Sequence, residues 1–254
     1  MKIANLFEVK GFSAQKIQLF GVECEVESLA WDQIAKMPPT IQVHEDGSLR
    51  NNGREFVSSP QSLEDTMVSF EQLHKLLVYQ HPEQAFSSRT SIHVHMNCQP
   101  LDETVVKRIM LFYALFEEVF FELVEPSRRN NIHCVALTET ALPDRYGMSL
   151  ANLHSSWSKY TALNLLPLSN LGTIEFRHMQ GHNDPKVLRE WLTVLDRLFH
   201  LASNTELTGK TLTRNNMVSW FAFLFGHTQR FQELLSRLDL FTENTIIDVK
   251  MGLL

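Results

Sequence analysis

The stretch "FGVECEVES", residues 20–28, predicts the strand around which the rest of the fold is arranged. Glu23, Glu25 and Glu27 alternate with apolar residues along this stretch. Because successive side chains of a strand point to opposite faces of a sheet, the three carboxylates share one face and the apolar groups share the other. A solvated sheet surface produces this pattern, and a strand that lines a metal site also produces it.

Three further segments, "GREFVSSP", "RTSIHVHMN" and "LGTIEFRHM", show the same alternation of polar and apolar residues. Their polar positions are, in chain order, Glu55, His93, His95, Glu175 and Arg177. Taken singly, each pattern is typical of an ordinary sheet surface. The presence of all four in one chain favours a functional site.

The residue types of these segments indicate which ligands such a site binds. Carboxylate oxygens with an occasional imidazole suit Mg²⁺ or Mn²⁺ rather than zinc. Several carboxylates on one sheet face repel one another, and a bound cation relieves this repulsion. The planar fork of an arginine binds two phosphate oxygens at once. Together these residues predict a site for metal ions and a nucleotide.

The hydrophobic periodicity predicts strands and helices in mixed order, which is an α+β fold rather than a regular βαβ fold. Strands or strand-like segments are expected at residues 17–27, 41–60, 89–97, 160–168 and 171–179. Turns are expected at Asp46-Gly47 and Asn52-Gly53. Helix starts are expected at Ser59-Pro60, Asp102 and Asp184-Pro185, with a short helix at 145–155 and a helical region after about residue 203.

Composition limits the class of protein. The chain of 254 residues, with 44% hydrophobic and 20% charged residues, suits one globular domain over residues 1–254. Its formal charge of −6 gives no indication of a nucleic-acid partner. The apolar runs are too short to cross a bilayer, and the first residues lack the apolar core of a signal peptide. Three widely spaced cysteines predict neither a disulfide framework nor a zinc site, so we expect a cytoplasmic protein without a membrane partner.

In order, "FGVECEVE", "DGSL", "GREFVSSP", "SIHVHMN" and "KYTALNLLPLSNLGTIEFRHMQG" resemble the amidoligase family. The resemblance spans residues 18–183, and its last motif is the most specific. The family is similar to glutamine synthetase and glutamate–cysteine ligase. It implies an antiparallel sheet with an open active face, helices on the other face, and a helical C-terminal region over residues 184–254.

The resemblance also implies roles for individual residues. Metal ligands are implied at Glu23, Glu25, Glu55, His93 and Glu175. Contacts with the nucleotide are implied for His95, Arg177, Asn164 and Tyr160. Catalytic roles are implied for Glu55, Arg177 and Asp46, with the general base unassigned between the two carboxylates. Ser91 stands where glutamine synthetase has a glycine-rich approach, and Glu27 is placed toward the edge of the sheet.

The activity implied is an ATP- and Mg²⁺-dependent (or Mn²⁺-dependent) carboxylate–amine ligase that acts through an acyl phosphate. Its substrates would be small-molecule or peptide carboxylates and amines, and the resemblance is compatible with an oligomer. Two alternatives remain open. One is a catalytically silent binding or assembly module of the same fold. The other is a metal-dependent hydrolase or nuclease that uses His93, His95 and the glutamates.

Overall fold

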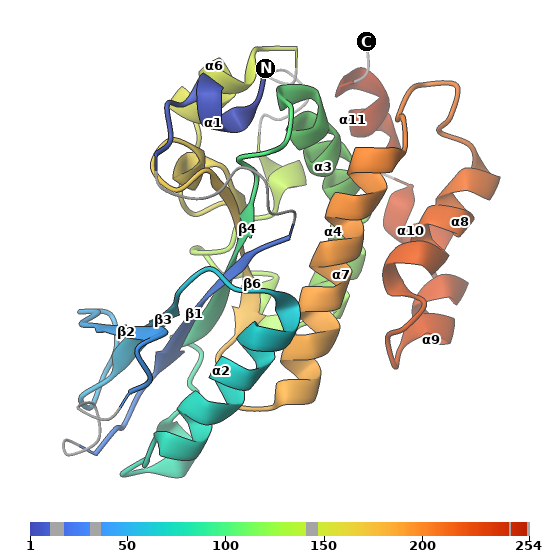
Figure 1. Cartoon of the computed structure of the whole chain (residues 1–254). Coiled ribbons are helices and arrows are strands. Elements are labelled where there is room, and N and C mark those ends of the chain that lie inside the picture. The colour runs from blue at the N-terminus through green and yellow to red at the C-terminus, as the bar shows by residue number, and fades with distance from the viewer. Residues whose placement is uncertain (11–17, 31–36, 141–146, 244, 253–254) are drawn as a thin grey trace.

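A six-stranded antiparallel sheet forms the centre of the computed structural model, with strand order β2–β3–β1–β4–β6–β5 (Figure 1). The structure describes residues 1–10, 18–30, 37–140, 147–243 and 245–252. The strands are β1 (Phe20–Val26), β2 (Ile41–His44), β3 (Arg54–Ser58), β4 (Ser91–Asn97), β5 (Leu163–Asn164) and β6 (Thr173–Gln180). The expected α+β fold with an antiparallel sheet is confirmed.

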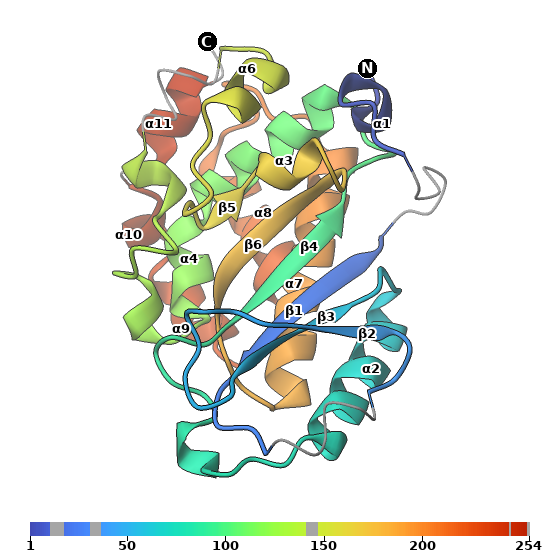
Figure 2. The same ribbon diagram turned by 90° about the vertical axis from the view of Figure 1, so that its left-hand side faces the viewer.

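Helices cover one face of this sheet, and the other face is turned toward the viewer in Figure 2. The helices next to the sheet are α2 (Leu63–Leu76), α3 (Glu103–Leu115), α4 (Glu117–Glu122) and α7 (Pro185–Asn204). An outer layer is formed by α8 (Arg214–Phe225), α9 (Phe231–Ser236), α10 (Leu238–Thr242) and α11 (Thr245–Gly252). Short elements are α1 (Ile3–Leu6), α6 (Leu150–Ser155), η2 (Pro82–Gln84), η3 (Pro126–Arg128), η4 (Leu137–Glu139) and η5 (Leu166–Leu168). Among the described residues, no helix combines the length and apolar character needed to cross a bilayer.

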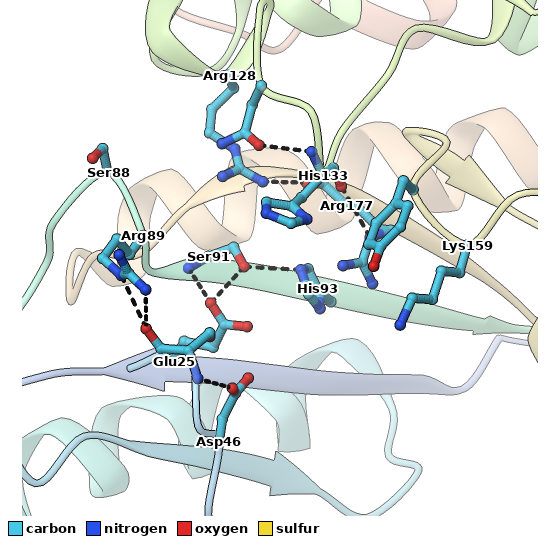
Figure 3. A pocket seen from close by; sticks show the side chains of 13 residues that line it. Glu25, Asp46, Ser88, Arg89, Ser91, His93, Arg128, His133, Lys159 and Arg177 are labelled. Carbon is cyan, nitrogen blue, oxygen red and sulfur yellow. Dashed lines mark hydrogen bonds between the residues drawn. The ribbon is translucent and has the colours of Figure 1, made fainter. Parts of the chain in front are cut away.

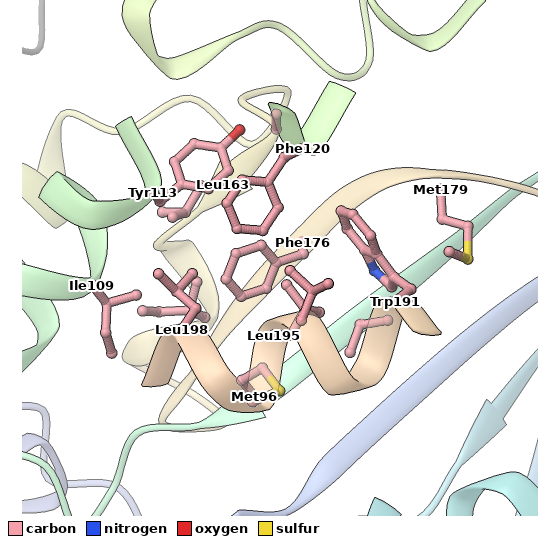
Figure 4. Packing of buried hydrophobic residues seen from close by; sticks show 14 of the residues in the cluster. Met96, Ile109, Tyr113, Phe120, Leu163, Phe176, Met179, Trp191, Leu195 and Leu198 are labelled. Carbon is pink, nitrogen blue, oxygen red and sulfur yellow. The ribbon is translucent and has the colours of Figure 1, made fainter. Parts of the chain in front are cut away.

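Large apolar side chains fill the space between the sheet and the helices (Figure 4). Phe176 of β6 packs there with Trp191 and Leu195 of α7 and with Tyr113 of α3. Each of these residues is at most 2% exposed. Burial of one such side chain contributes about 1.5–3 kcal/mol. The apolar positions of the strands therefore fix the helix-covered face, and the alternating polar positions must point the other way.

The pairing of the strands brings the polar positions of different segments together. Glu25 of β1 lies opposite Glu55 of β3, and Glu23 of β1 lies opposite His93 of β4. On the other side of β4, His95 lies opposite Glu175 of β6. All these residues therefore share the uncovered face, which we call the polar face.

The register between β4 and β6 shifts at Arg177 and His178 of β6. Ile92 pairs with Met179, whereas Val94 pairs with Phe176, so two residues of β6 lie opposite His93 alone. Such a bulge places an extra residue in one strand and turns its side chains locally. Arg177 remains on the polar face, whereas His178 is fully buried against the helices.

The start of α2 differs from the prediction at Ser59-Pro60. The helix begins at Leu63, and the hydroxyl of Ser62 accepts a hydrogen bond from the Asp65 amide. Gln61 exchanges two backbone hydrogen bonds with Phe20, the first residue of β1, so the chain is still extended at Gln61. A sheet contact with a distant segment thus overrides the local helix-start signal.

The other predicted elements are confirmed with shorter bounds. Asp184 caps α7, because its carboxylate accepts a hydrogen bond of 2.8 Å from the Lys186 amide. The strand-like segment at 160–168 contributes only β5 and then turns into η5. Both predicted turns lie within the single loop that joins β2 to β3. Residue 17 of the first predicted strand and residues 145 and 146 of the predicted short helix lie outside the described residues.

Candidate functional site

Two histidines of β4 and two glutamates from the neighbouring strands meet on the polar face. Nδ1 of His93 lies 3.3 Å from Oε2 of Glu23 and 3.4 Å from Oε1 of Glu175. Nε2 of His95 lies 3.1 Å from Oε1 of Glu23. Four of the residues predicted from separate segments therefore form one cluster.

Three groups of potential metal ligands follow one another across this face. The groups are Glu23, His95 and Glu175; then Glu23, Glu55 and His93; then Glu25, Asp46 and Glu55. Within each group, one donor atom from each residue lies within 4.8 Å of the others. Glu23 and Glu55 each belong to two groups, so the seven residues form a continuous chain of ligands that we call the carboxylate line.

One buried atom shows that the carboxylate line fits a cation. Nδ1 of His95 lies 2.9 Å from the hydroxyl of Thr173, which leaves the other ring nitrogen to face Glu23. That nitrogen, Nε2, is buried and has no hydrogen-bond partner of good geometry. A ring held through one nitrogen, with the other nitrogen beside carboxylates, is the usual arrangement of a metal-binding histidine. The donor set of carboxylates and imidazoles fits Mg²⁺ or Mn²⁺.

The electrostatics of the line are uneven. Burial favours the neutral form of Glu23, but the His93 and His95 rings beside its carboxylate outweigh burial and hold the pKa of Glu23 well below its usual range. Burial and the negative charge of Glu23 raise the pKa of Glu55 to about 7. Burial works against a charge on His95, yet the Glu23 carboxylate beside the ring raises the pKa of this histidine. Glu23 therefore stays ionised beside the two rings, while excess negative charge remains around Glu55.

Glu175 is held in place by two neighbours for which the family resemblance implies contacts with the nucleotide. The side-chain amide of Asn164 donates a hydrogen bond of 2.6 Å to Oε2 of Glu175. Arg177 forms an ion pair with the other oxygen, and its Nε donates to the backbone carbonyl of His133. In this structure Asn164 and Arg177 thus orient a carboxylate of the line.

A cationic pocket of about 370 Å³ opens at the Asp46 end of the line (Figure 3). Its lining includes three arginines, Arg89, Arg128 and Arg177, together with Lys159 and His133, and we name the pocket after these residues. Tyr160 also lines it. Ser91 lines the pocket as well, together with Glu25 and Asp46 of the carboxylate line.

A second pocket of about 390 Å³ lies on the same polar face at the His95 end of the line. Its lining includes Gly21, Val57, Pro60 and Leu171, together with His95. It is less charged than the cationic pocket, and Glu23 is the one carboxylate among its described lining residues. The carboxylate line therefore runs between two pockets of different character.

A family model described as "Putative amidoligase enzyme" matches residues 33–199, which is more than half of the chain. The chain belongs to the amidoligase family. A comparison with curated proteins found no match. The family assignment indicates a ligase and agrees with the resemblance of the motifs.

Most of the carboxylate line lies within the amidoligase match. Asp46, Glu55, His93, His95 and Glu175 all fall inside residues 33–199. Glu23 and Glu25 precede the matched residues. The pairing of β1 with β3 and β4 places these two glutamates beside residues of the matched segment.

Glu27 does not extend the line. It is 1% exposed and follows the last residue of β1. Its carboxylate accepts a hydrogen bond of 2.9 Å from the Arg50 amide in the loop between β2 and β3. Glu27 therefore holds this loop. Cys24 is buried on the helix-covered face, where burial raises the pKa of its thiol, and it offers no nucleophile.

Three contributors to the amidoligase site were not predicted in these roles. Ser91 contacts both Glu25 and His93, and Thr173 orients His95. Both lie two residues from a predicted site residue on the same strand, so the alternation of the strand was an available signal. Arg128 lines the cationic pocket from η3, where no sequence periodicity marks it.

Proposed function

We propose that this amidoligase is an ATP- and Mg²⁺-dependent carboxylate–amine ligase with a glutamine synthetase-like fold, acting through an acyl phosphate. The observation that carries the proposal is the carboxylate line, which extends across the polar face between two pockets. A single metal would need one group of three ligands. Three overlapping groups are better suited to a polyphosphate substrate, whose charge several cations share.

The proposed reaction has two steps. An oxygen of the substrate carboxylate attacks the γ-phosphorus of ATP, ADP leaves, and an acyl phosphate forms. The nitrogen of the amine then attacks the carbonyl carbon, and inorganic phosphate leaves as the amide forms. The amine gives up its proton to a carboxylate of the enzyme. Mg²⁺, when bound by the carboxylate line, supplies charge neutralisation of the phosphate oxygens.

Residues of this chain take specific parts in that reaction. Arg177 stands at the border between Glu175 and the cationic pocket, where its guanidinium can steady the transferred phosphoryl group. Of the two candidate bases, Asp46 lines the cationic pocket together with Glu25. We therefore favour Asp46 as the group that takes the proton of the amine, with Glu55 retained as a metal ligand.

We assign the nucleotide and the carboxylate substrate to different pockets. The less charged pocket beside His95 suits the nucleoside part of ATP, because apolar walls accept a base and a ribose. The cationic pocket suits the carboxylate substrate, because Arg89, Arg128 and Lys159 attract an anion. Tyr160 offers an aromatic surface at its rim.

The test is formation of ADP and phosphate from ATP and Mg²⁺ in the presence of pooled amino acids, amines and peptides. We expect ADP release that requires both a carboxylate and an amine, and its loss in Glu175→Ala. Glu64→Ala is a matched control, because Glu64 is exposed and pairs with Arg189 away from the polar face. ADP release without any amine would instead indicate a hydrolase. No turnover with any pool, despite ATP binding, would favour the silent binding module.

A further inference from the structure

Ser91 joins two residues of the carboxylate line at the border of the cationic pocket (Figure 3). Its hydroxyl lies 2.7 Å from Oε2 of Glu25 and 2.8 Å from Nε2 of His93. Its backbone amide donates a second hydrogen bond, of 2.8 Å, to the same oxygen of Glu25. Ser91 is 4% exposed, so water competes little for these contacts.

A count of protons decides the direction of these hydrogen bonds. A hydroxyl has one proton to donate, and a carboxylate can only accept. The proton of Ser91 therefore goes to Glu25, and the hydroxyl oxygen accepts from Nε2–H of His93. The Nδ1 atom of a neutral His93 is then left with its lone pair.

The lone pair of Nδ1 faces the region that a cation would occupy. Nδ1 lies 3.3 Å from Glu23 and 3.4 Å from Glu175, which are both carboxylates. A lone pair beside two negative charges is unfavourable unless a cation lies between them. Ser91 thus prepares His93 to bind a metal through Nδ1.

The same contacts restrict Glu25. Two donors of Ser91 converge on its Oε2 atom, which leaves Oε1 free for a metal. Glu25 belongs to the ligand group with Asp46 and Glu55, whereas His93 belongs to the group with Glu23 and Glu55. One hydroxyl therefore fixes a ligand in each of two adjacent groups.

We propose that Ser91 is a positioning residue that holds His93 in its Nε2–H tautomer and couples two neighbouring cation sites of the line. Thr173 does the converse for His95, since it contacts Nδ1 and leaves Nε2 free. The two histidines of "HVH" then bind metal through opposite ring nitrogens. The proposal rests on the proposed function only in requiring that the line binds divalent cations.

The test uses the full chain and two measurements that do not depend on turnover. Nitrogen-15 NMR of labelled histidine reports the tautomer of His93, and calorimetry with Mn²⁺ reports cation affinity. We expect the Nε2–H tautomer, with Nδ1 unprotonated, in the Mg²⁺-bound protein and its loss in Ser91→Ala. Mn²⁺ affinity should fall about 10- to 100-fold, as is usual when the partner of a metal ligand is removed. Ser91→Thr, which keeps the hydroxyl, should restore both.

The control is Ser88→Ala, because Ser88 is exposed and lines the same cationic pocket. It should leave the tautomer and the Mn²⁺ affinity unchanged. An Nδ1–H tautomer in the Mg²⁺-bound wild-type protein, or unchanged Mn²⁺ affinity in a folded Ser91→Ala, would overturn the proposal. If Ser91→Ala does not fold, the wild-type tautomer and Ser91→Thr still decide. Failure of the ligase proposal would appear separately, as absent ADP release with normal Mn²⁺ binding.

Discussion

Asn164 of β5 donates a hydrogen bond of 2.6 Å to Glu175, its direct cross-strand partner in β6. Both residues are at most 4% exposed. The two-residue edge strand β5 therefore orients Glu175, because it places the side-chain amide of Asn164 beside this carboxylate. The other oxygen of Glu175 is taken by Arg177, so both oxygens are oriented.

Asn164→Ala should weaken both the fold and the site. Loss of the amide leaves a buried carboxylate without one donor, which costs about 1–3 kcal/mol of unfolding free energy. Mn²⁺ affinity should fall about 10-fold or more, because Glu175 is no longer held. Denaturant unfolding and calorimetry measure the two effects. Asn152→Ala, at an exposed position of α6, should change neither, and equal effects in both variants would refute the assigned role.

Arg177→Lys should retain folding but lose turnover. Lysine keeps the positive charge but lacks the planar fork that binds two oxygens at once. We expect a decrease in kcat of about 10²- to 10³-fold, which is typical when a group that stabilises developing charge is removed. Arg189→Lys is the matched control, because Arg189 also pairs with a glutamate but lies on an exposed surface. A changed KM with an unchanged kcat would place Arg177 in ground-state binding instead.

Glu55→Gln should stabilise the metal-free protein and weaken its response to metal. Glu55 lies opposite Glu25, and like charges in such a pair cost about 0.2–1 kcal/mol. The variant should therefore have a higher Tm than the wild type in EDTA. With Mn²⁺ the order should reverse, because a ligand that binds the folded state stabilises it more when its affinity is higher. A lower Tm of the variant in EDTA would contradict the repulsion inferred here.

Stability should fall in acid because of His178. Burial, together with the charge of Arg128, lowers the pKa of this histidine to about 3, against an ordinary value of 6.5. Between these values the unfolded chain binds a proton that the folded protein does not. Stability is therefore complete above pH 6.5 and decreases as the pH falls toward 3, by up to about 1.4 kcal/mol per pH unit.

The contribution of His178 can be separated from that of other groups. His74 and His182, whose pKa values are lowered to about 4 by burial, act in the same direction. Unfolding free energies at pH 7 and pH 5 should therefore be compared between wild type and His178→Gln. The variant should lose about 2 kcal/mol less than the wild type over this interval. His81→Gln, at an exposed position, should follow the wild type. Parallel pH profiles for His178→Gln and wild type would show that His178 is not the responsible group.

The sequence by itself determined which residues share a face of a strand. The alternation around Glu23, His93 and Glu175 depends only on the period of an extended chain, so the polar face could be predicted from each segment separately. The helix cap at Asp184 also depends only on neighbouring residues, because its carboxylate accepts a hydrogen bond from the Lys186 amide. These features needed no knowledge of which strands pair.

Only the tertiary structure decided which faces meet and in which register. Glu25 and Ser91 are 66 positions apart, and their contact depends on the pairing of β1 with β4. Asp46 enters the line because the loop between β2 and β3 brings it within 4.8 Å of Glu25 and Glu55. The start of α2 lies at Leu63 because Gln61 pairs with Phe20. Register is set by distant contacts and turn geometry, and a shift of one residue would send every side chain of a strand to the opposite face. The local pattern therefore predicted most of the candidate ligands, whereas the pairing of the strands brought them together.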